Sequence, residues 1–124
     1  TEFERTEEEL LSDFNIVKTT EEQIGDKQIW NNTLLISHNP PKATICDKVN
    51  EEIHAGSQLF TDFILENQPL AVICGHVHEG VGQEKIGNTV VVNPGSLADG
   101  YYAWMEISKK DDNWSVNKVE MCRL

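Results

Sequence analysis

Positive charge is scarce in this sequence: 10 Lys and Arg residues stand against 21 Asp and Glu residues, which gives a formal net charge of -11. Proteins that hold nucleic acid through their overall electrostatic field need clusters of Lys and Arg to neutralise the phosphate backbone. Nucleic-acid binding of that kind is therefore not expected. An anionic substrate would have to be attracted locally, for example by a metal ion.

Cysteine is also sparse, and long apolar runs are missing. The three cysteines, Cys46, Cys74 and Cys122, form no CxxC pair, which argues against a zinc ribbon and against a dense disulfide framework. No apolar run approaches the ~20 residues of a membrane-spanning helix, and no secretory signal pattern is present. We therefore expect a soluble, cytoplasmic protein without a membrane partner.

The hydrophobic pattern predicts an α/β layered domain. An amphipathic helix is expected after the capping box of residues 6–9, with an apolar face formed by Leu10, Leu11, Phe14 and Val17. Residues 19–32 are polar, carry a turn signal at Gly25-Asp26, and are expected to be irregular. Further elements are expected as follows: buried strands at 33–37 and 70–74, a helix from its N-cap Ser57 to residue 67, and strand pairs at 81–86 with 89–92 and at 101–107 with 114–121.

Three of the four histidines, His38, His76 and His78, follow the carboxyl ends of expected buried strands. Layered α/β domains concentrate their chemistry at that edge. In the HVH segment, alternate residues of an extended chain point the same way, so both imidazoles can reach one small volume. Gly75 and Gly80 are expected to give the backbone room there. Imidazole pairs suit zinc, manganese, iron or cobalt better than calcium or magnesium. The alternative is that these histidines only pack, hydrogen-bond a loop carbonyl or contact solvent.

Other polar residues near these segments have two interpretations each. His54 lies in the polar loop of residues 42–56 and precedes a helix start, where backbone donors could hold an anion, but it could equally be a solvated loop residue. Residues 93–96 (NPGS) form a turn that is structural unless it borders the histidines. The nearest acidic residues could contact a metal or could be ordinary surface carboxylates; they are Asp47, Glu79 and Asp99.

Three segments in this order resemble the carboxyl-terminal half of the calcineurin-like metallophosphoesterases, especially their small prokaryotic branch. They are residues 36–41 (ISHNPP), 74–79 (CGHVHE) and 93–96 (NPGS). Each is weak alone, but SHxPP and GHxH are specific together, and the resemblance spans roughly residues 6–107. It implies an α/β fold that is part of a four-layer α-β-β-α sandwich, a mixed sheet with flanking helices. Residues 1–124 would form the carboxyl-terminal portion of a single domain.

The resemblance also implies an activity, namely hydrolysis of phosphomonoesters or phosphodiesters by a metal-bound hydroxide at a dinuclear site. The two divalent ions would be Mn, Fe, Zn, Co or Ni. By matching position, His38 and His76 would bind the second metal and His78 the first. Asn93, Gly95 and Ser96 would form a supporting loop, and His54 would face the substrate.

The chain departs from the family pattern in one respect. The family's aspartate-x-histidine, glycine-aspartate and glycine-asparagine-histidine motifs supply the bridging carboxylate, most ligands of the first metal and the general-acid histidine, and none is found in these residues. We therefore expect the remaining ligands upstream of Thr1, no catalytic residue within the chain, and an inactive isolated chain. Two alternatives remain: a non-catalytic binding or scaffold protein on the same fold, or a second chain or copy that completes the fold.

Overall fold

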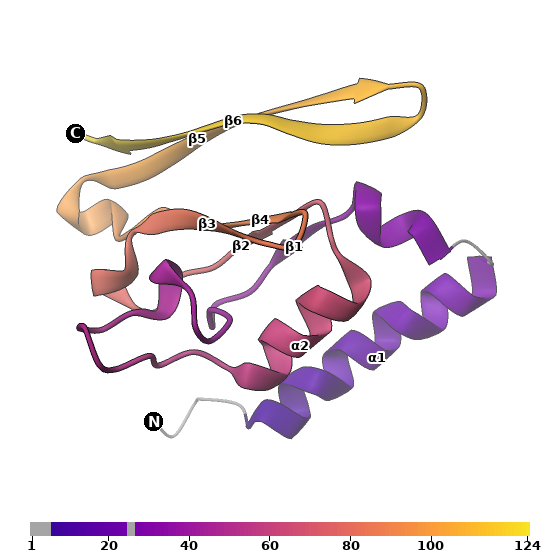
Figure 1. The fold of residues 1–124 in the computed structure, drawn as a ribbon, viewed down its shortest axis with the longest axis horizontal. Coiled ribbons are helices and arrows are strands. Elements are labelled where there is room, and N and C mark those ends of the chain that lie inside the picture. Colours follow the sequence, from indigo (N-terminus) through magenta and orange to yellow (C-terminus); the bar gives the residue numbers. More distant parts are fainter. Residues whose placement is uncertain (1–5, 25–26) are drawn as a thin grey trace.

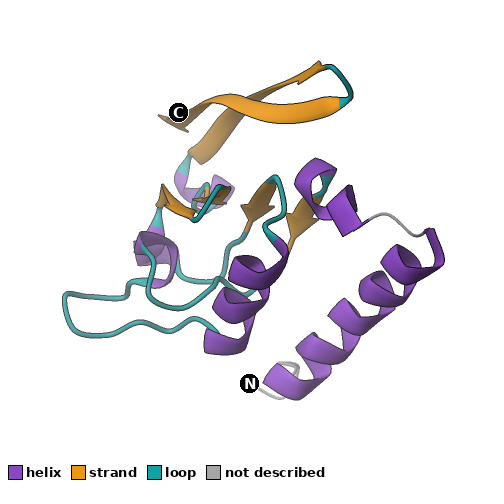
Figure 2. Ribbon diagram, turned by 45° about the vertical axis from the view of Figure 1, so that its right-hand side comes forward, coloured by secondary structure: helices purple, strands orange, loops and turns teal. Residues whose placement is uncertain are grey.

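The computed structural model describes residues 6–24 and 27–124, and it arranges them in three stacked layers (Figure 1). Two helices form the first layer, a four-stranded sheet the second and a long hairpin the third, and Figure 2 shows the same stacking from another side. The helices are α1 (Glu7–Ile24) and α2 (Gln58–Asn67). The strands of the sheet are β1 (Leu34–Ile36), β2 (Ala71–Ile73), β3 (Gly82–Ile86) and β4 (Thr89–Asn93), and the hairpin consists of β5 (Tyr101–Lys110) and β6 (Asn113–Arg123).

The four-stranded sheet is mixed, with the spatial order β1-β2-β4-β3. Strands β1, β2 and β4 run parallel, whereas β3 pairs antiparallel with β4 through the turn that the sequence predicts at Gly87-Asn88. The three parallel strands therefore end at the same edge of the sheet. The segments that follow β1 and β2 are the ones that carry His38 and His76.

Strand β4 is buried along its whole length and contributes to two cores. Val91 packs with Trp30, Phe60 and other apolar residues on the helical face. Val90 and Val92 face the other way, where Met105 and further apolar residues of the hairpin cover them. The alternation follows from the two-residue period of a strand. It explains why β4 reads as a continuous apolar run, as strands covered on both faces do.

The first helix begins as the capping box predicts. The Thr6 main-chain nitrogen donates to Glu9 Oε2 at 3.1 Å, and the Glu9 main-chain nitrogen donates to Thr6 Oγ1 at 3.2 Å. The side chains of the expected apolar face lie outside the described part of the structure; they are Leu10, Leu11, Phe14 and Val17.

The prediction that residues 19–32 are irregular is wrong. Helix α1 continues to Ile24, and residues Lys27–Asn32 form a 3-10 helix; the turn expected at Gly25-Asp26 lies outside the described residues. Tertiary packing accounts for the 3-10 helix, because Trp30 is only 1% exposed and makes an edge-on ring contact with Phe63 of α2. The polar pattern around Trp30 gave no sign of that contact.

The second helix confirms its prediction closely, and the short strands confirm theirs in position. Helix α2 has Ser57 as its N-cap, whose hydroxyl accepts a hydrogen bond from the Phe60 main-chain nitrogen at 3.2 Å. Its apolar face, which includes Phe60, Phe63 and Ile64, is buried against the sheet. Strands β1 and β2 fall within the expected ranges, and β2 is largely buried as expected. The burial predicted for β1 is wrong, because Leu34 is 43% and Ile36 78% exposed on a strand that pairs on one side only among the described residues.

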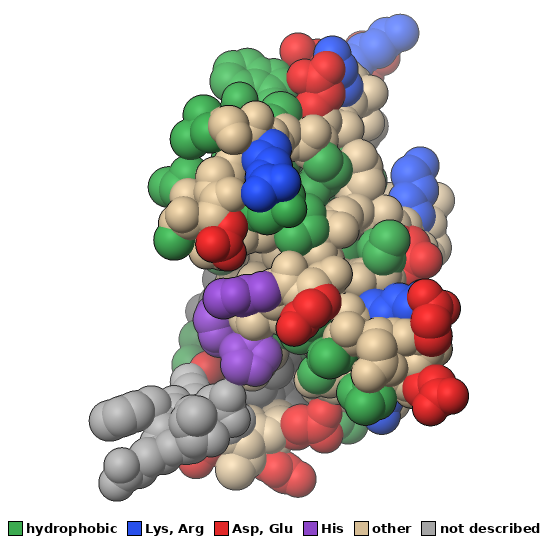
Figure 3. Space-filling model, turned by 90° about the vertical axis from the view of Figure 1, so that its left-hand side faces the viewer, with side chains coloured by type: hydrophobic (Ala, Val, Ile, Leu, Met, Phe, Trp, Pro, Cys, Tyr) green, Lys and Arg blue, Asp and Glu red, His purple; other side chains and the backbone are tan. Residues whose placement is uncertain are grey.

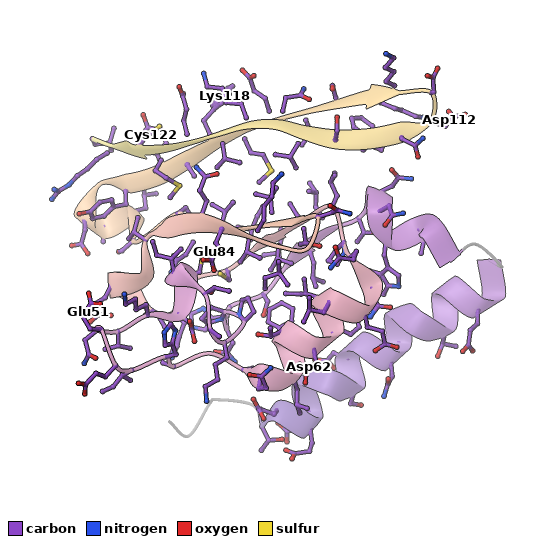
Figure 4. The ribbon with its side chains drawn as sticks, viewed as in Figure 1. Glu51, Asp62, Glu84, Asp112, Lys118 and Cys122 are labelled. Atoms are coloured by element: carbon purple, nitrogen blue, oxygen red, sulfur yellow. The ribbon has the colours of Figure 1, made fainter. Side chains whose placement is uncertain are left out.

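The hairpin is longer than the sequence predicts. The sequence predicts a first strand that ends at residue 107 and a second that begins at 114, but β5 extends to Lys110, β6 begins at Asn113, and only Asp111 and Asp112 form the turn. Both have positive φ, of 51° and 65°, as a two-residue turn that matches strand twist requires. Apolar side chains of the hairpin pack against Val90 and Val92 of the sheet, while Lys118 and Cys122 lie along the hairpin (Figure 4).

The fold class predicted from the sequence is confirmed as a mixed α/β arrangement with a mixed sheet and flanking helices. Within the described residues it comprises three of the four layers of an α-β-β-α sandwich, because no helix covers the outer face of the hairpin. None of the helices in this part of the chain combines the length and apolar character that a bilayer crossing requires.

Candidate metal centre

Two of the predicted metal ligands meet at the carboxyl edge of the sheet. His38 Nε2 lies 3.0 Å from His76 Nδ1, although the two residues are 38 positions apart in the sequence. The Gly75 main-chain nitrogen donates to the His38 carbonyl oxygen at 3.0 Å, which ties the two loops together next to the rings. Both histidines are exposed, and histidine side chains gather in one patch on the face that Figure 3 shows.

The spacing of the two nitrogens fits a shared metal ion. Metal–imidazole bonds are about 2.0–2.1 Å long, so two imidazole nitrogens in adjacent coordination positions at a right angle lie about 3 Å apart. The observed 3.0 Å agrees with that value, and it also fits a hydrogen bond in which one neutral ring donates to the other. The donor set, two neutral imidazoles, suits a divalent transition metal.

His76 has a φ of 65°, in the left-handed region that a residue with a side chain rarely occupies. Such a conformation costs of order 1–3 kcal/mol and persists only where the surroundings enforce it. Here the enforcing contacts include the hydrogen bond from the Val77 main-chain nitrogen to the Gly75 carbonyl oxygen, at 2.7 Å. The strained backbone therefore accompanies the close approach of the His76 ring to His38.

His78 does not join the other two histidines in a ligand group. It is exposed and begins a short 3-10 helix, His78–Gly80. Among the residues that the structure describes, no three His, Cys, Asp or Glu side chains are grouped to hold a metal ion. The described residues thus offer a two-imidazole partial site, and the assignment of each histidine to a metal stays a prediction.

Gly75 and Gly80, which flank the segment from His76 to His78, have different roles. A Cβ atom on Gly80 would lie within 2.2 Å of the Cys46 carbonyl oxygen, so only glycine fits there. A Cβ atom on Gly75 would meet nothing closer than the His38 carbonyl oxygen, at 3.9 Å. The expectation that glycine gives the backbone room at this turn therefore applies to Gly80 alone.

Asn93 joins the segments that surround the histidines. Its side chain is 1% exposed, and its Nδ2 donates to the Val77 carbonyl oxygen at 2.8 Å and to the Cys46 carbonyl oxygen at 3.2 Å. Its Oδ1 accepts a hydrogen bond from the Gly95 main-chain nitrogen at 3.1 Å. Because Val77 stands between His76 and His78, Asn93 fixes the backbone that presents both rings.

The rest of the NPGS loop forms the turn between Asn93 and strand β5. Gly95 has a φ of 87°, and a Cβ atom there would lie 2.7 Å from Tyr101 Cβ. The Ser96 carbonyl oxygen accepts hydrogen bonds from the main-chain nitrogens of Asp99 and Tyr101, both at 3.1 Å. Through Asn93 the loop borders the histidine segment, while Gly95 and Ser96 make the turn into β5.

Asp47 was expected to be a surface carboxylate or a metal neighbour, and the surface interpretation is wrong. Its side chain is 0% exposed, and its Oδ1 lies 2.6 Å from His54 Nδ1. The sequence contained a signal for its backbone hydrogen bonds but not for its burial: Thr44-x-x-Asp47 is a capping pattern, and the Thr44 main-chain nitrogen donates to Asp47 Oδ1 at 3.0 Å. Glu79 and Asp99 are exposed, as the surface interpretation expects.

Two buried thiols lie beneath the histidine edge. Cys46 is 0% exposed and Cys74 is 4% exposed, and both belong to the helical-face core. The hydrogen bond between the Cys74 and Cys46 side chains, together with burial, raises the pKa of Cys74 far above that of a free thiol. Cys74 therefore stays protonated in the folded protein and acts as a small apolar side chain.

Comparison with known proteins identifies the family to which the chain belongs. Residues 13–116 match the family described as metallophosphoesterase, calcineurin superfamily. An uncharacterized protein of Methanocaldococcus jannaschii is 42% identical over 84 residues, which cover 60% of this chain and 38% of that protein.

Two crystal structures are also similar. One has a TM-score of 0.56 at 31% identity and covers 73% of this chain and 32% of its own. The other, a protein of Thermus thermophilus, has a TM-score of 0.44 at 22% identity and covers 73% of this chain and 33% of its own. The chain thus spans well under half the length of these relatives. The family match covers most of the chain, and the chain belongs to the metallophosphoesterases of the calcineurin superfamily.

Proposed function

We propose that this chain contributes part of a dinuclear metal centre to a metal-dependent phosphoesterase that hydrolyses phosphomonoesters or phosphodiesters. The observation that carries the proposal is the 3.0 Å approach of His38 Nε2 to His76 Nδ1 at the carboxyl edge of parallel strands. Membership of the superfamily supports a divalent metal at this edge. When bound, the metals would neutralise charge on the phosphoryl oxygens and provide a nucleophile at neutral pH.

The chain's own residues would hold the ligands in place. His38 and His76 would bind one ion through neutral imidazole nitrogens, and His78 would reach the other. Asn93 would keep the His76–His78 backbone fixed through its bond to the Val77 carbonyl oxygen, at 2.8 Å. The carboxylates that a dinuclear site needs would come from outside the described residues, because no group of three ligating side chains exists within them.

Metal-stimulated hydrolysis tests the proposal in the full-length gene product that contains these residues. We expect turnover of p-nitrophenyl phosphate or bis-p-nitrophenyl phosphate on addition of Mn²⁺, and its loss with a chelator. His76→Ala should lower the rate by about 100-fold or more, since even neighbours of metal ligands matter by 10–100-fold. Lys109→Ala, at a half-exposed hairpin position, is the control and should leave the rate unchanged. Absence of turnover with every divalent ion tried would refute the proposal.

A second candidate is a binding or scaffold protein that keeps the fold without the reaction. It is favoured by the lack of a three-ligand group in the described part of the chain. Retained partner binding after His38→Ala and His76→Ala, together with no hydrolysis by the wild type, would support it.

The edge strand β1 suggests that further protein covers the sheet. Ile36 is 78% exposed and Leu34 is 43% exposed, on a strand that pairs only with β2 among the described residues. An apolar edge strand of this kind invites pairing. We therefore propose that additional residues of the same domain pair with β1, with a second chain or copy as the alternative. Light scattering tests the second copy, because a monomer of the full-length product excludes it.

A further inference from the structure

Two adjoining cavities lie between the hairpin and the side of the four-stranded sheet that ends in the edge strand β3. The larger has a volume of about 350 Å³ and the smaller a volume of about 240 Å³. Lys85 of β3, Val90 of β4 and Val116 of β6 line both cavities, which together form what we call the hairpin groove. Small-molecule sites usually measure about 300–1,000 Å³, so the groove has the size of such a site.

The larger cavity lies at the end of the sheet opposite to the histidine pair. Leu70 comes directly before β2 and Asn88 directly before β4, and both residues line this cavity. His38 and His76, in contrast, follow the carboxyl ends of β1 and β2. The parallel strands therefore separate the hairpin groove from the candidate metal centre, and a molecule bound in the groove would not contact the histidines.

An apolar wall runs along the larger cavity. Four of its lining residues are Pro69, Leu70, Val90 and Val116. Trp114 lines it from the hairpin and is 39% exposed. The Trp114 main-chain nitrogen donates to Asn32 Oδ1 at 3.0 Å, which holds this end of the hairpin over the 3-10 helix Lys27–Asn32 (Figure 1). A partly exposed indole beside aliphatic side chains offers a flat surface on which an aromatic ring can stack.

Lys85 brings a positive charge to the middle of the groove. Gln83 Nε2 donates to the Val119 carbonyl oxygen at 3.0 Å, so Gln83 faces the hairpin, and Lys85, two residues further along β3, faces the same way. Within the described residues Lys85 makes no ion pair, whereas Lys109 and Lys118 lie 3.5 and 2.8 Å from carboxylate oxygens. In a chain of net charge -11, a cation without an acidic neighbour favours an anionic ligand.

Amide side chains complete the polar side of the larger cavity. Gln68 is already committed, because its Oε1 accepts from the Asn88 main-chain nitrogen at 2.6 Å and its Nε2 donates to the Ile86 carbonyl oxygen at 3.3 Å. The side chains of Asn31 and Asn88 are exposed and form no hydrogen bond with the part of the chain that the structure describes. They are available to polar atoms of a ligand.

We propose that the hairpin groove binds a small aromatic molecule that carries one anionic group. The ring would stack on Trp114 and cover Val116, and the anionic group would pair with the Lys85 ammonium group. Asn31 and Asn88 would bond to polar atoms at the rim. This site is distinct from the proposed phosphoesterase centre, because it lies at the other end of the parallel strands.

Two fluorescent probes that differ in charge test the site in the full-length gene product. The anionic probe is 8-anilino-1-naphthalenesulfonate, and the neutral probe is N-phenyl-1-naphthylamine, the same ring system without the sulfonate. We expect saturable binding of the anionic probe to the wild type. Lys85→Gln should raise the Kd of the anionic probe by about fivefold, the upper range for a partly exposed ion pair, and leave the Kd of the neutral probe unchanged. Trp114→Ala should raise the Kd of both probes by about fivefold.

Each variant has a matched control elsewhere on the hairpin. Lys110→Gln makes the same change in net charge at an exposed position that lines neither cavity, and it should bind both probes as the wild type does. Trp104 is 58% exposed and alternates with Ala103 and Met105, which pack on the sheet, so it lies on the outer face and Trp104→Ala should also bind normally.

Circular dichroism and the thermal unfolding temperature show whether each variant is folded, since partly unfolded proteins also bind such probes. If Trp114→Ala does not fold, the contrast between Lys85→Gln and Lys110→Gln decides alone. Absence of binding to the wild type, or a Kd for the anionic probe that Lys85→Gln leaves unchanged, would overturn the proposal. A loss in Trp104→Ala instead would place the probe on the outer face and overturn it too. Hydrolysis is not part of this readout, so the failure of either proposal leaves the other standing.

Discussion

Replacing Asn93 with alanine is expected to destabilise the protein strongly, because this side chain satisfies two buried carbonyl oxygens at once. Asn93 is 1% exposed and donates to the carbonyl oxygens of Val77 and Cys46 at 2.8 and 3.2 Å. Leaving one buried polar group without a partner costs about 1–3 kcal/mol. With two acceptors affected and a small cavity left behind, we expect a loss of about 3–5 kcal/mol in the free energy of unfolding.

Urea denaturation followed by circular dichroism measures this loss. A change of that size lowers the midpoint temperature by roughly 10 °C or more in a domain of this length. Asn88→Ala is the matched control, because the Asn88 side chain is exposed and its main-chain nitrogen, which the substitution keeps, makes the bond to Gln68 Oε1 at 2.6 Å. Asn88→Ala should change stability by less than about 0.5 kcal/mol. Equal effects of the two substitutions would refute the argument that Asn93 braces the histidine segment.

Three further predictions concern glycine, the hairpin turn and the thiols. Gly80→Ala should destabilise the fold by more than about 2 kcal/mol, since its Cβ would strike a main-chain carbonyl at 2.2 Å, whereas Gly75→Ala, with 3.9 Å of room, should cost under about 1 kcal/mol in the same urea assay. Asp112→Gly should raise the midpoint temperature by relieving a φ of 65°, and a lowered midpoint would contradict this. Because the pKa of Cys74 is raised on folding, its contribution to stability is present below the ordinary thiol value of 9.0 and is lost as pH rises beyond it. Urea midpoints should therefore fall less between pH 7 and 10 in Cys74→Ala than in the wild type. Iodoacetamide should modify Cys122 before the two buried cysteines.

Much of the fold could be predicted from local pattern. The capping box at Thr6, the N-cap at Ser57 and the turn at Gly87-Asn88 each carry their own backbone chemistry, and each lies where the sequence places it. Short apolar runs bounded by such signals were identified correctly as strands for the same reason. The 3-10 helix at Lys27–Asn32 was missed because its cause is a contact between Trp30 and Phe63, far apart in the sequence.

The candidate site also has one part that could be predicted from the sequence and one that could not. The convergence of His38 and His76 could be predicted, because both follow parallel strands that end at one edge. The pairing of Asp47 with His54 could not be predicted from spacing, since it depends on a loop that brings the main-chain nitrogens of Ala43, Thr44 and Gly56 to one carboxylate. The partner of a polar loop residue is determined by tertiary contacts that no local pattern records.

The burial of β4 on both faces has a consequence for the accuracy of the site. A slip of one residue along this strand would still place valines in both cores, but it would move Thr89 and Asn93, at its two ends, away from the buried carbonyl oxygens of Pro69 and Val77 to which they donate. The strand therefore has one permitted register, and this register fixes the position of its last residue, Asn93. The register of β4 therefore places the Asn93 amide that holds the His76 segment through its hydrogen bond to the Val77 carbonyl oxygen. Substitutions at Val90 or Val92, remote from any imidazole, should for that reason loosen the geometry of the histidine pair before they unfold the domain.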